Sequence, residues 1–244
     1  MKNPNWERDE LILALDFKLK PGQIHAKNPE IIKLSDILNR LPIHPERPDA
    51  VRFRNSNGVG LKLSNFLAID PQYAGKGMAA YAKLDKEVFD EFKVNKEVLN
   101  KLATQIRKIS ENVELTSKLK LIKNESSEEK HIAKEGQILY KLHKYRERNQ
   151  TLIKKKKEQH YRKYSNLACE LCGFDFEKTY GEVGKGFIEC HHKTPLAELT
   201  AETTNSLDDL ILVCSNCHRM FHQGWQAARM INKSNMPIAI SPQD

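Results

Sequence analysis

Two pairs of cysteines have the spacing of a metal site. Cys169 and Cys172 form one C-x-x-C pair, Cys214 and Cys217 form the other, and 41 residues separate the pairs. Four thiolates suit tetrahedral zinc, and closing such loops around the ion contributes to folding. A redox role and simple burial are the other interpretations of paired cysteines. We expect one structural Zn²⁺ ion, whereas the unpaired Cys190 fits a small buried strand residue.

Four histidines lie in or beside the same segments. His191 and His192 are adjacent, and His218 and His222 are four residues apart, which places the second pair on one face of a helix. Neighbouring residues of a strand point to opposite sides, so one of the adjacent histidines can ligate an ion while the other faces water or a substrate. With a return strand at 210–213 and a helix from about residue 216, the pattern predicts a β-hairpin packed on a helix around one metal ion.

These segments resemble an HNH endonuclease of the McrA-like restriction type. The resemblance covers about residues 166–225 and rests on Cys169-x-x-Cys172, Tyr180-Gly181, Ile188-Glu-x-His-His192, Pro195-Leu196, Asp209-Leu210 and Val213-Cys-x-Asn-Cys-His-Arg-Met-Phe-His222. The stretch from 135 to 157, with Arg146-Glu-Arg-Asn149, is similar to the helical lead-in of many HNH restriction proteins. Residues 1–92 resemble an N-terminal domain found in such proteins.

The resemblance implies roles for three histidines. His191 corresponds to the first ligand of a catalytic divalent ion, Mg²⁺ or another metal, and His218 corresponds to the second ligand. His192 corresponds to the general base, which takes a proton from the attacking water. His222 matches a further ligand in the colicin-type nucleases, or it orients phosphate.

Two charged residues beside the histidines are also candidates. Arg219 lies one residue beyond His218, where it could bind the scissile phosphate or remain an exposed helix arginine. Asp209 stands where the family's middle asparagine is expected, which puts the hairpin-bracing role of that asparagine in doubt, although an aspartate can still accept backbone hydrogen bonds.

Positive charge is concentrated in one segment. The chain has a formal net charge of +8, and residues 131–165 alone carry 11 basic and 3 acidic groups, whereas residues 166–244 carry 6 basic and 10 acidic groups. Such a block either contacts a polyanion or forms a solvated lysine-rich helix. Because the nuclease segment is acidic, we expect the basic segment to supply the phosphate contacts to double-stranded DNA. The candidates are Lys154, Lys155, Lys156, Lys157, Arg162 and Lys163.

Composition divides the chain into three parts of an α+β protein: a mixed, mainly helical N-terminal domain at 1–94, a charged helical linker at 95–165, and a ββα-metal nuclease with zinc knuckles at 166–244. Helices are expected after caps at Asn5 and Asn28 and over about 78–92. Residues 55–58 predict a turn between short apolar stretches. The apolar seam at 94–113 can pack on either domain or on a second copy, so a homodimer is possible.

The leading hypothesis is a metal-dependent DNA endonuclease that acts in restriction or phage defence. Residues 1–94 would be its targeting module, with Arg52 and Arg54 contacting DNA and a modified cytosine as a reasonable target. The alternative is a non-catalytic zinc-containing DNA-binding protein, and a dimerisation role for residues 1–130 is a third interpretation. The longest apolar runs have five residues and the N-terminus is charged, which predicts a cytoplasmic protein without a membrane span.

Overall fold

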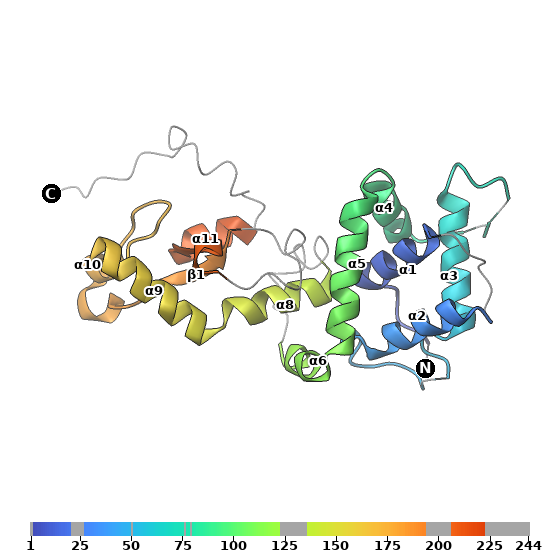
Figure 1. Ribbon diagram of the computed structural model, residues 1–244, viewed down its shortest axis with the longest axis horizontal. Coiled ribbons are helices and arrows are strands. Elements are labelled where there is room, and N and C mark those ends of the chain that lie inside the picture. Colours follow the sequence, from blue (N-terminus) through green and yellow to red (C-terminus); the bar gives the residue numbers. More distant parts are fainter. Residues whose placement is uncertain are drawn as a thin grey trace. The chain divides into compact units, whose positions relative to one another are not determined.

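The computed structural model describes residues 2–20, 27–49, 51–75, 77–78, 80–122, 136–193 and 206–222. Within these ranges the chain is mainly helical and has one two-stranded sheet, which confirms the expected α+β character at this coarse level (Figure 1). No helix in the described ranges is long and apolar enough to cross a membrane.

The chain forms two compact units, residues 1–143 and 144–244, with the boundary inside α8 (Gln137–Glu147). Unit 1 contains α1 (Arg8–Lys18), α2 (Pro29–Arg40), α3 (Ser56–Ile69), α4 (Lys83–Phe92), α5 (Lys96–Glu111) and α6 (Val113–Lys120). Unit 2 contains α9 (Gln150–Tyr164), α10 (Phe176–Tyr180), η2 (Gly181–Gly184), β1 (Glu189–His192), η3 (Leu207–Asp209), β2 (Leu210–Val213) and α11 (Ser215–His222).

These units differ from the boundaries at 94 and 165 that composition predicts. The central part of the apolar seam, Leu102, Ile106 and Ile109, is buried in unit 1, where α5 packs on α1 and α2, whereas Val94, Val98 and Val113 are exposed. The basic helix α9 belongs to unit 2, where it packs on β2 and η3. In the described residues, the two halves of the expected linker are therefore parts of the units on either side.

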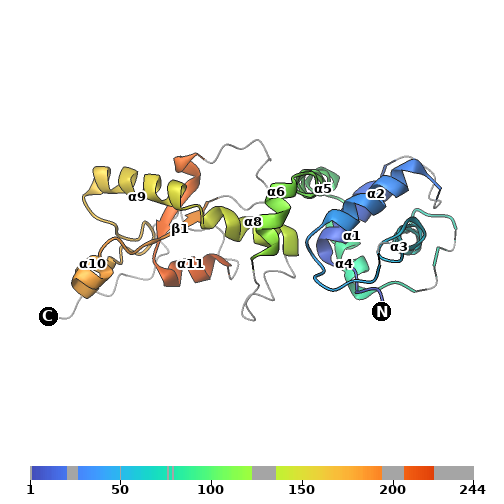
Figure 2. The same ribbon diagram turned by 90° about the horizontal axis from the view of Figure 1, so that it is seen from below.

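Helix α1 is the centre of unit 1. Residues 11–15 have no exposed surface, because α1 contacts α2, α3, α4 and α5 (Figure 2). A helix that is buried all round needs no polar face, which explains five consecutive apolar residues. Unit 1 is thus a helical unit built around its first helix.

Asparagine caps begin two helices of unit 1. Asn28 Oδ1 accepts a hydrogen bond from the backbone N–H of Glu30 at 2.9 Å, which confirms the predicted cap. Asn55 Oδ1 accepts from the N–H of Gly58 at 2.8 Å and caps α3, so the predicted turn between apolar stretches is wrong. An asparagine side chain accepts a nearby N–H in both turns and caps, and burial of the apolar face of α3 favours the helix here.

Two other helices begin later than the sequence predicts. α1 starts after Glu7 rather than after Asn5, and the side chain of Glu10 accepts the N–H of Glu7 at 2.9 Å. α4 starts at Lys83 rather than near residue 78, since the carboxylate of Asp85 accepts the N–H of Ala82 at 3.0 Å. In both cases an acidic residue at the third helical position fixes the start.

The Arg54 side chain is buried at the start of α3 and is 2% exposed. Its Nε and Nη2 donate to the two carboxylate oxygens of Glu10 at 2.7 and 2.8 Å. The guanidinium also donates to the carbonyl oxygens of Pro4 and Asn5 at 3.0 and 2.8 Å, and it lies over the ring of Trp6. Because all three guanidinium nitrogens are engaged inside unit 1, this placement contradicts the prediction that Arg54 contacts DNA.

We predict that Arg54→Ala strongly destabilises unit 1, because it leaves the carboxylate of Glu10 buried without its main cationic partner. Removal of one member of such a pair costs roughly 3–5 kcal/mol of unfolding free energy. Urea unfolding followed by circular dichroism measures this cost. The control is Arg52→Ala, whose side chain is 70% exposed and should shift the unfolding free energy by no more than about 0.5 kcal/mol. Equally small effects of both changes would contradict the assignment.

Candidate functional site

The two strands of unit 2 form a short antiparallel hairpin. Glu189 pairs with Val213 and His192 pairs with Leu210, and the backbone N–H of Lys193 continues the ladder to the carbonyl of Asp209 at 2.8 Å. Helix α11 follows β2 and packs on both strands. The residues between 193 and 206, which include Pro195 and Leu196, lie outside the described part of the chain. The structure therefore has the hairpin and helix that the sequence predicts.

A small apolar core holds this hairpin. Its buried members are Cys169, Ile188, Cys190, Leu210, Leu212, Val213, Cys214 and Cys217, and Leu152 and Ile153 of α9 pack against them. Cys190 is 6% exposed, in agreement with its interpretation as a plain buried strand residue. The cysteine pairs and the core thus occupy one small volume.

All four paired cysteines come together. Their sulfur atoms lie within 4.8 Å of one another, and the Sγ atoms of Cys172 and Cys214 are 3.7 Å apart. Gly173 supplies the left-handed backbone (φ 75°) that turns the chain after the first pair, and its N–H donates to the carbonyl of Cys169 at 2.9 Å. Burial, together with the neighbouring Cys169, raises the pKa of the Cys217 thiol. Thiols crowded in this way ionise together only when a cation binds them, so the four residues fit a zinc ion.

A second cluster joins His191, His218 and two glutamates. The imidazole Nδ1 of His191 lies 2.5 Å from Oε1 of Glu147, at the end of α8, and Nε2 of His218 lies 3.1 Å from the same oxygen. The other nitrogen of His218, Nδ1, is hydrogen-bonded to the carboxylate of Glu189, which also accepts from the hydroxyl of Ser215. The structure therefore brings together the two histidines expected to be metal ligands.

Negative charge surrounds His218. Burial favours its neutral form, but the hydrogen bonds to Glu147 and Glu189 outweigh burial and raise the pKa of His218 to about 9. The hydrogen bond from His218 lowers the pKa of Glu189 and outweighs burial, which raises it. The cluster therefore favours a positive charge at this point, and its nitrogen and oxygen donors are of the kind that bind divalent metal ions.

His192 is buried and is 3% exposed. As the next residue of β1, it points to the opposite side of the strand from His191.

Arg219 is exposed on α11, so it could either bind phosphate or be a plain surface arginine. The side chain of His222, at the end of α11, lies outside the described residues. Asp209 accepts the N–H of Ser206 at 3.1 Å, so it braces the start of β2 through a backbone hydrogen bond.

Neither Glu147 nor Glu189 is predicted as a site residue from the sequence. Glu189 stands two residues before His191 and thus on the same face of β1. The alternation of side chains along a strand could therefore have predicted that the two lie close together. Glu147 lies in the Arg146-Glu-Arg-Asn149 segment, whose resemblance to a helical lead-in does not indicate that its carboxylate reaches the histidines. The position of Glu147 follows only from the structure.

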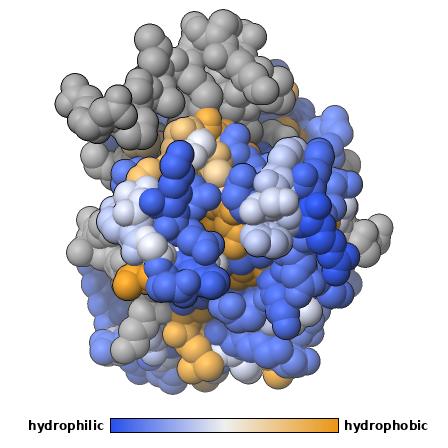
Figure 3. Space-filling model, turned by 90° about the vertical axis from the view of Figure 1, so that its left-hand side faces the viewer, coloured by the Kyte–Doolittle hydropathy of each residue, from blue (hydrophilic) through white to orange (hydrophobic). Residues whose placement is uncertain are grey.

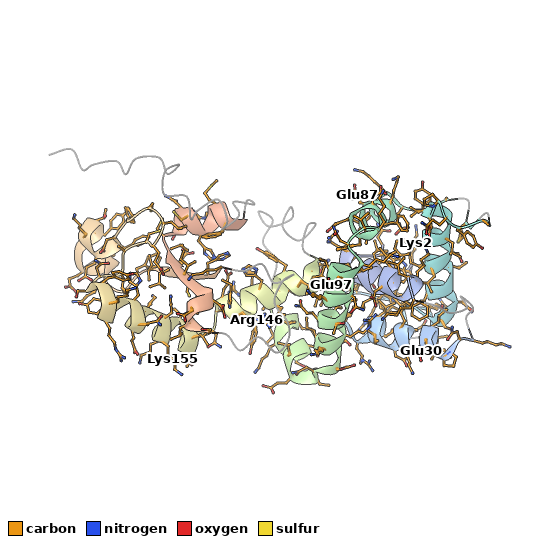
Figure 4. All side chains as sticks on the ribbon, turned by 45° about the horizontal axis from the view of Figure 1, so that its top comes forward. Lys2, Glu30, Glu87, Glu97, Arg146 and Lys155 are labelled. Carbon is orange, nitrogen blue, oxygen red and sulfur yellow. The ribbon has the colours of Figure 1, made fainter. Side chains whose placement is uncertain are left out.

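The basic helix α9 has an inner and an outer face. Lys154, Lys155, Arg162 and Lys163 are exposed, and Figure 4 shows Lys155 projecting from the helix away from the strands. Lys156 is 7% exposed, and Lys157 donates to the carbonyl of Gly186 at 2.7 Å. The expected DNA-contacting set is therefore divided, because two of its lysines pack against unit 2 itself.

The Tyr180–Gly186 loop closes onto α10. A Cβ at Gly184 would lie 2.0 Å from the carbonyl oxygen of Phe176, so only glycine fits there. The rings of Phe176 and Phe187 meet edge to face with their centroids 4.7 Å apart. Tyr180 remains 60% exposed, and Figure 3 shows apolar surface between hydrophilic side chains on this side of unit 2. The loop packs locally, and its approach to DNA stays a prediction.

Comparison with known proteins finds a family and a relative. Residues 169–224 match the family model described as HNH endonuclease. A stretch of 63 residues is 36% identical to the type IV methyl-directed restriction enzyme EcoKMcrA of Escherichia coli (strain K12), covering 26% of this chain and 21% of that relative. No solved structure matches the chain. The segment 169–224, with its β1–β2 hairpin, its α11 helix and its clustered histidines, thus matches the HNH endonuclease family, and a 63-residue stretch of the chain is McrA-like.

Proposed function

We propose that the chain is a metal-dependent endonuclease that hydrolyses phosphodiester bonds of double-stranded DNA in restriction or phage defence. The observation that carries this proposal is the convergence of His191 and His218 on one carboxylate oxygen. A protein that only binds DNA does not need this arrangement. Cleavage of matched plasmids, with and without modified cytosine, in Mg²⁺, Mn²⁺ or Ni²⁺ tests the activity.

Each histidine has a role in this hydrolysis. His191 and His218 would hold the divalent ion, which would supply polarisation of the phosphate and charge neutralisation at the leaving 3′ oxygen. The imidazole of His192 accepts the proton of the attacking water, which a neutral histidine does near neutral pH. Exposed on α11 one residue beyond His218, Arg219 binds the scissile phosphate.

The four clustered cysteines hold structural zinc. They come from two segments on either side of the hairpin: the first pair lies on a turn before β1, and the second pair lies at the start of α11. Structural zinc sites are closed by four protein ligands, whereas a redox pair needs only one C-x-x-C. The zinc ion therefore joins the chain before β1 to the chain after β2.

The outer face of α9 supplies affinity for DNA. Unit 2 carries 15 basic and 12 acidic groups, since it includes α9 and the end of α8. Lysine and arginine side chains on one helix face bind phosphates and carry no sequence code. Selection of the target site is assigned to unit 1, where Arg52 is exposed. By analogy with the methyl-directed relative, the target contains a modified cytosine.

We predict that His192→Ala reduces cleavage by roughly 10²- to 10⁴-fold, because it removes the general base. Divalent-ion affinity and DNA affinity should stay close to those of the wild type, since His192 is not a ligand. Single-turnover cleavage and calorimetric titration with Mn²⁺ measure the two properties separately. A His192→Ala protein that cuts at the wild-type rate excludes the mechanism, and wild-type protein that binds DNA without cutting it in any metal supports the alternative of a non-catalytic DNA-binding protein.

We predict that Cys214→Ser loses the zinc ion and unfolds the hairpin region, because metal binding and folding of so small a core are coupled. Metal analysis of the purified chain should give one zinc per wild-type molecule. The matched control is Cys190→Ala, which removes a buried thiol outside the cluster and should retain the zinc. Wild-type protein that contains no zinc and stays folded in a chelator would contradict this role.

We predict that the double change Lys154→Gln and Lys155→Gln weakens binding to all DNA sequences alike. Each lost phosphate contact should lower the slope of log K against log salt by about 0.9. Fluorescence anisotropy over a range of salt concentrations measures the slope. Lys118→Gln on α6, which removes an exposed lysine paired with Glu114, is the control. An unchanged slope in the double variant would make the outer face of α9 a solvated surface.

A further inference from the structure

We infer that Glu147 is a third protein ligand of the divalent ion, beside His191 and His218; this inference rests on the proposed function. Oxygen Oε1 of Glu147 lies 2.5 Å from Nδ1 of His191 and 3.1 Å from Nε2 of His218. Its side chain is 9% exposed. One carboxylate oxygen therefore faces a nitrogen of each of the two expected ligands, and all three residues belong to unit 2.

The spacing of these atoms fits a common ion. Metal–nitrogen and metal–oxygen bonds of about 2.0–2.2 Å place neighbouring ligand atoms about 3 Å apart. The 3.1 Å distance from the Glu147 oxygen to Nε2 of His218 is of that size, whereas the 2.5 Å distance to Nδ1 of His191 is that of a short hydrogen bond, which the ion would replace. Two histidines and one carboxylate also form a donor set that divalent metals accept while open positions remain for water and phosphate.

The two glutamates have different positions around His218. Glu147 faces Nε2, whereas Glu189 is bonded to Nδ1, on the other side of the ring. A carboxylate that holds one imidazole nitrogen orients the ring and directs the other nitrogen to the metal. Ser215 donates its hydroxyl to Glu189 and thereby fixes this partner. Glu189 is accordingly a positioning residue, and Glu147 lies on the ligand side.

Charge balance supports the same assignment. The cluster contains two carboxylates and two imidazoles in a largely buried region. The two carboxylates carry a charge of −2, which a divalent ion held by two neutral histidines would balance. Buried charge is costly unless it is compensated. A divalent cation therefore matches the charge of this cluster, and Glu147 contributes half of the matching negative charge.

The test is a titration of the full-length, zinc-loaded chain with Mn²⁺ by calorimetry. Glu147→Gln keeps the size and hydrogen-bonding ability of the side chain but removes its charge, and we expect Mn²⁺ affinity to fall at least tenfold. Glu147→Asp keeps the carboxylate and should bind Mn²⁺ more tightly than Glu147→Gln. Glu182→Gln, at an 84% exposed glutamate of η2, should bind within twofold of the wild type. Mn²⁺ affinity within twofold of the wild type in Glu147→Gln would overturn the inference.

A second measurement needs no variant. In crystals of the wild-type chain soaked with Mn²⁺, the anomalous peak should lie about 2.2 Å from a Glu147 oxygen. A peak bound to His191 and His218 but separated from Glu147 by a water molecule would overturn the inference. These outcomes can be told apart from failure of the proposed function. If the wild-type chain cuts DNA but Glu147 does not contribute to Mn²⁺ binding, only this assignment is refuted. Mn²⁺ bound through Glu147 in a chain that cuts no DNA refutes only the nuclease proposal.

Discussion

The meeting of two cysteine pairs from opposite ends of the hairpin is the constraint on which the geometry of the HNH domain depends. A two-stranded hairpin is marginally stable alone, and strands of four residues bury little apolar surface. Cys172 precedes β1 and Cys214 follows β2 directly, so bringing their sulfur atoms to 3.7 Å closes the segment that contains both strands. α11 begins at the next residue, and its orientation is therefore set by the second cysteine pair.

That constraint also places the histidine cluster. His218 follows Cys217 directly, and His191 lies on the strand that pairs with β2. Both histidines are held by elements that the cysteines join, whereas Glu147 approaches from α8 and is 44 residues away from His191 in the sequence. Imidazole and carboxylate side chains from one strand and two helices thus meet at one point. The domain can bring these side chains together on a small core because the cysteine cluster fixes two of the three elements that contribute them.

Local patterns account for the parts of this site that sequence alone predicts. The C-x-x-C spacing, the alternation of a strand and the one-turn spacing of a helix each act over a few residues, so the clustering of the four cysteines and the hairpin could be inferred. The roles of the histidines follow from the family resemblance and stay predictions. Glu147 and the inner face of α9 depend on how distant helices dock, which no local pattern encodes. The composition-based boundary at 165 was misplaced for the same reason, because α9 is charged overall but its inner face packs on β2.

The arginines of unit 1 also show that residue type does not determine environment, since some of their side chains are buried and others are exposed. Arg54 and Arg47 both lie over the ring of Phe53, and Arg47 also donates to the carbonyl of Asn39 at 2.8 Å, so both stabilise the packing of unit 1. Arg40 and Arg52 are exposed. An arginine looks the same in the sequence whether it pairs with a buried glutamate or faces solvent. Only the exposed pair can meet a phosphate or a base edge, so a targeting role for unit 1 must rest on that surface rather than on the arginine count of the segment.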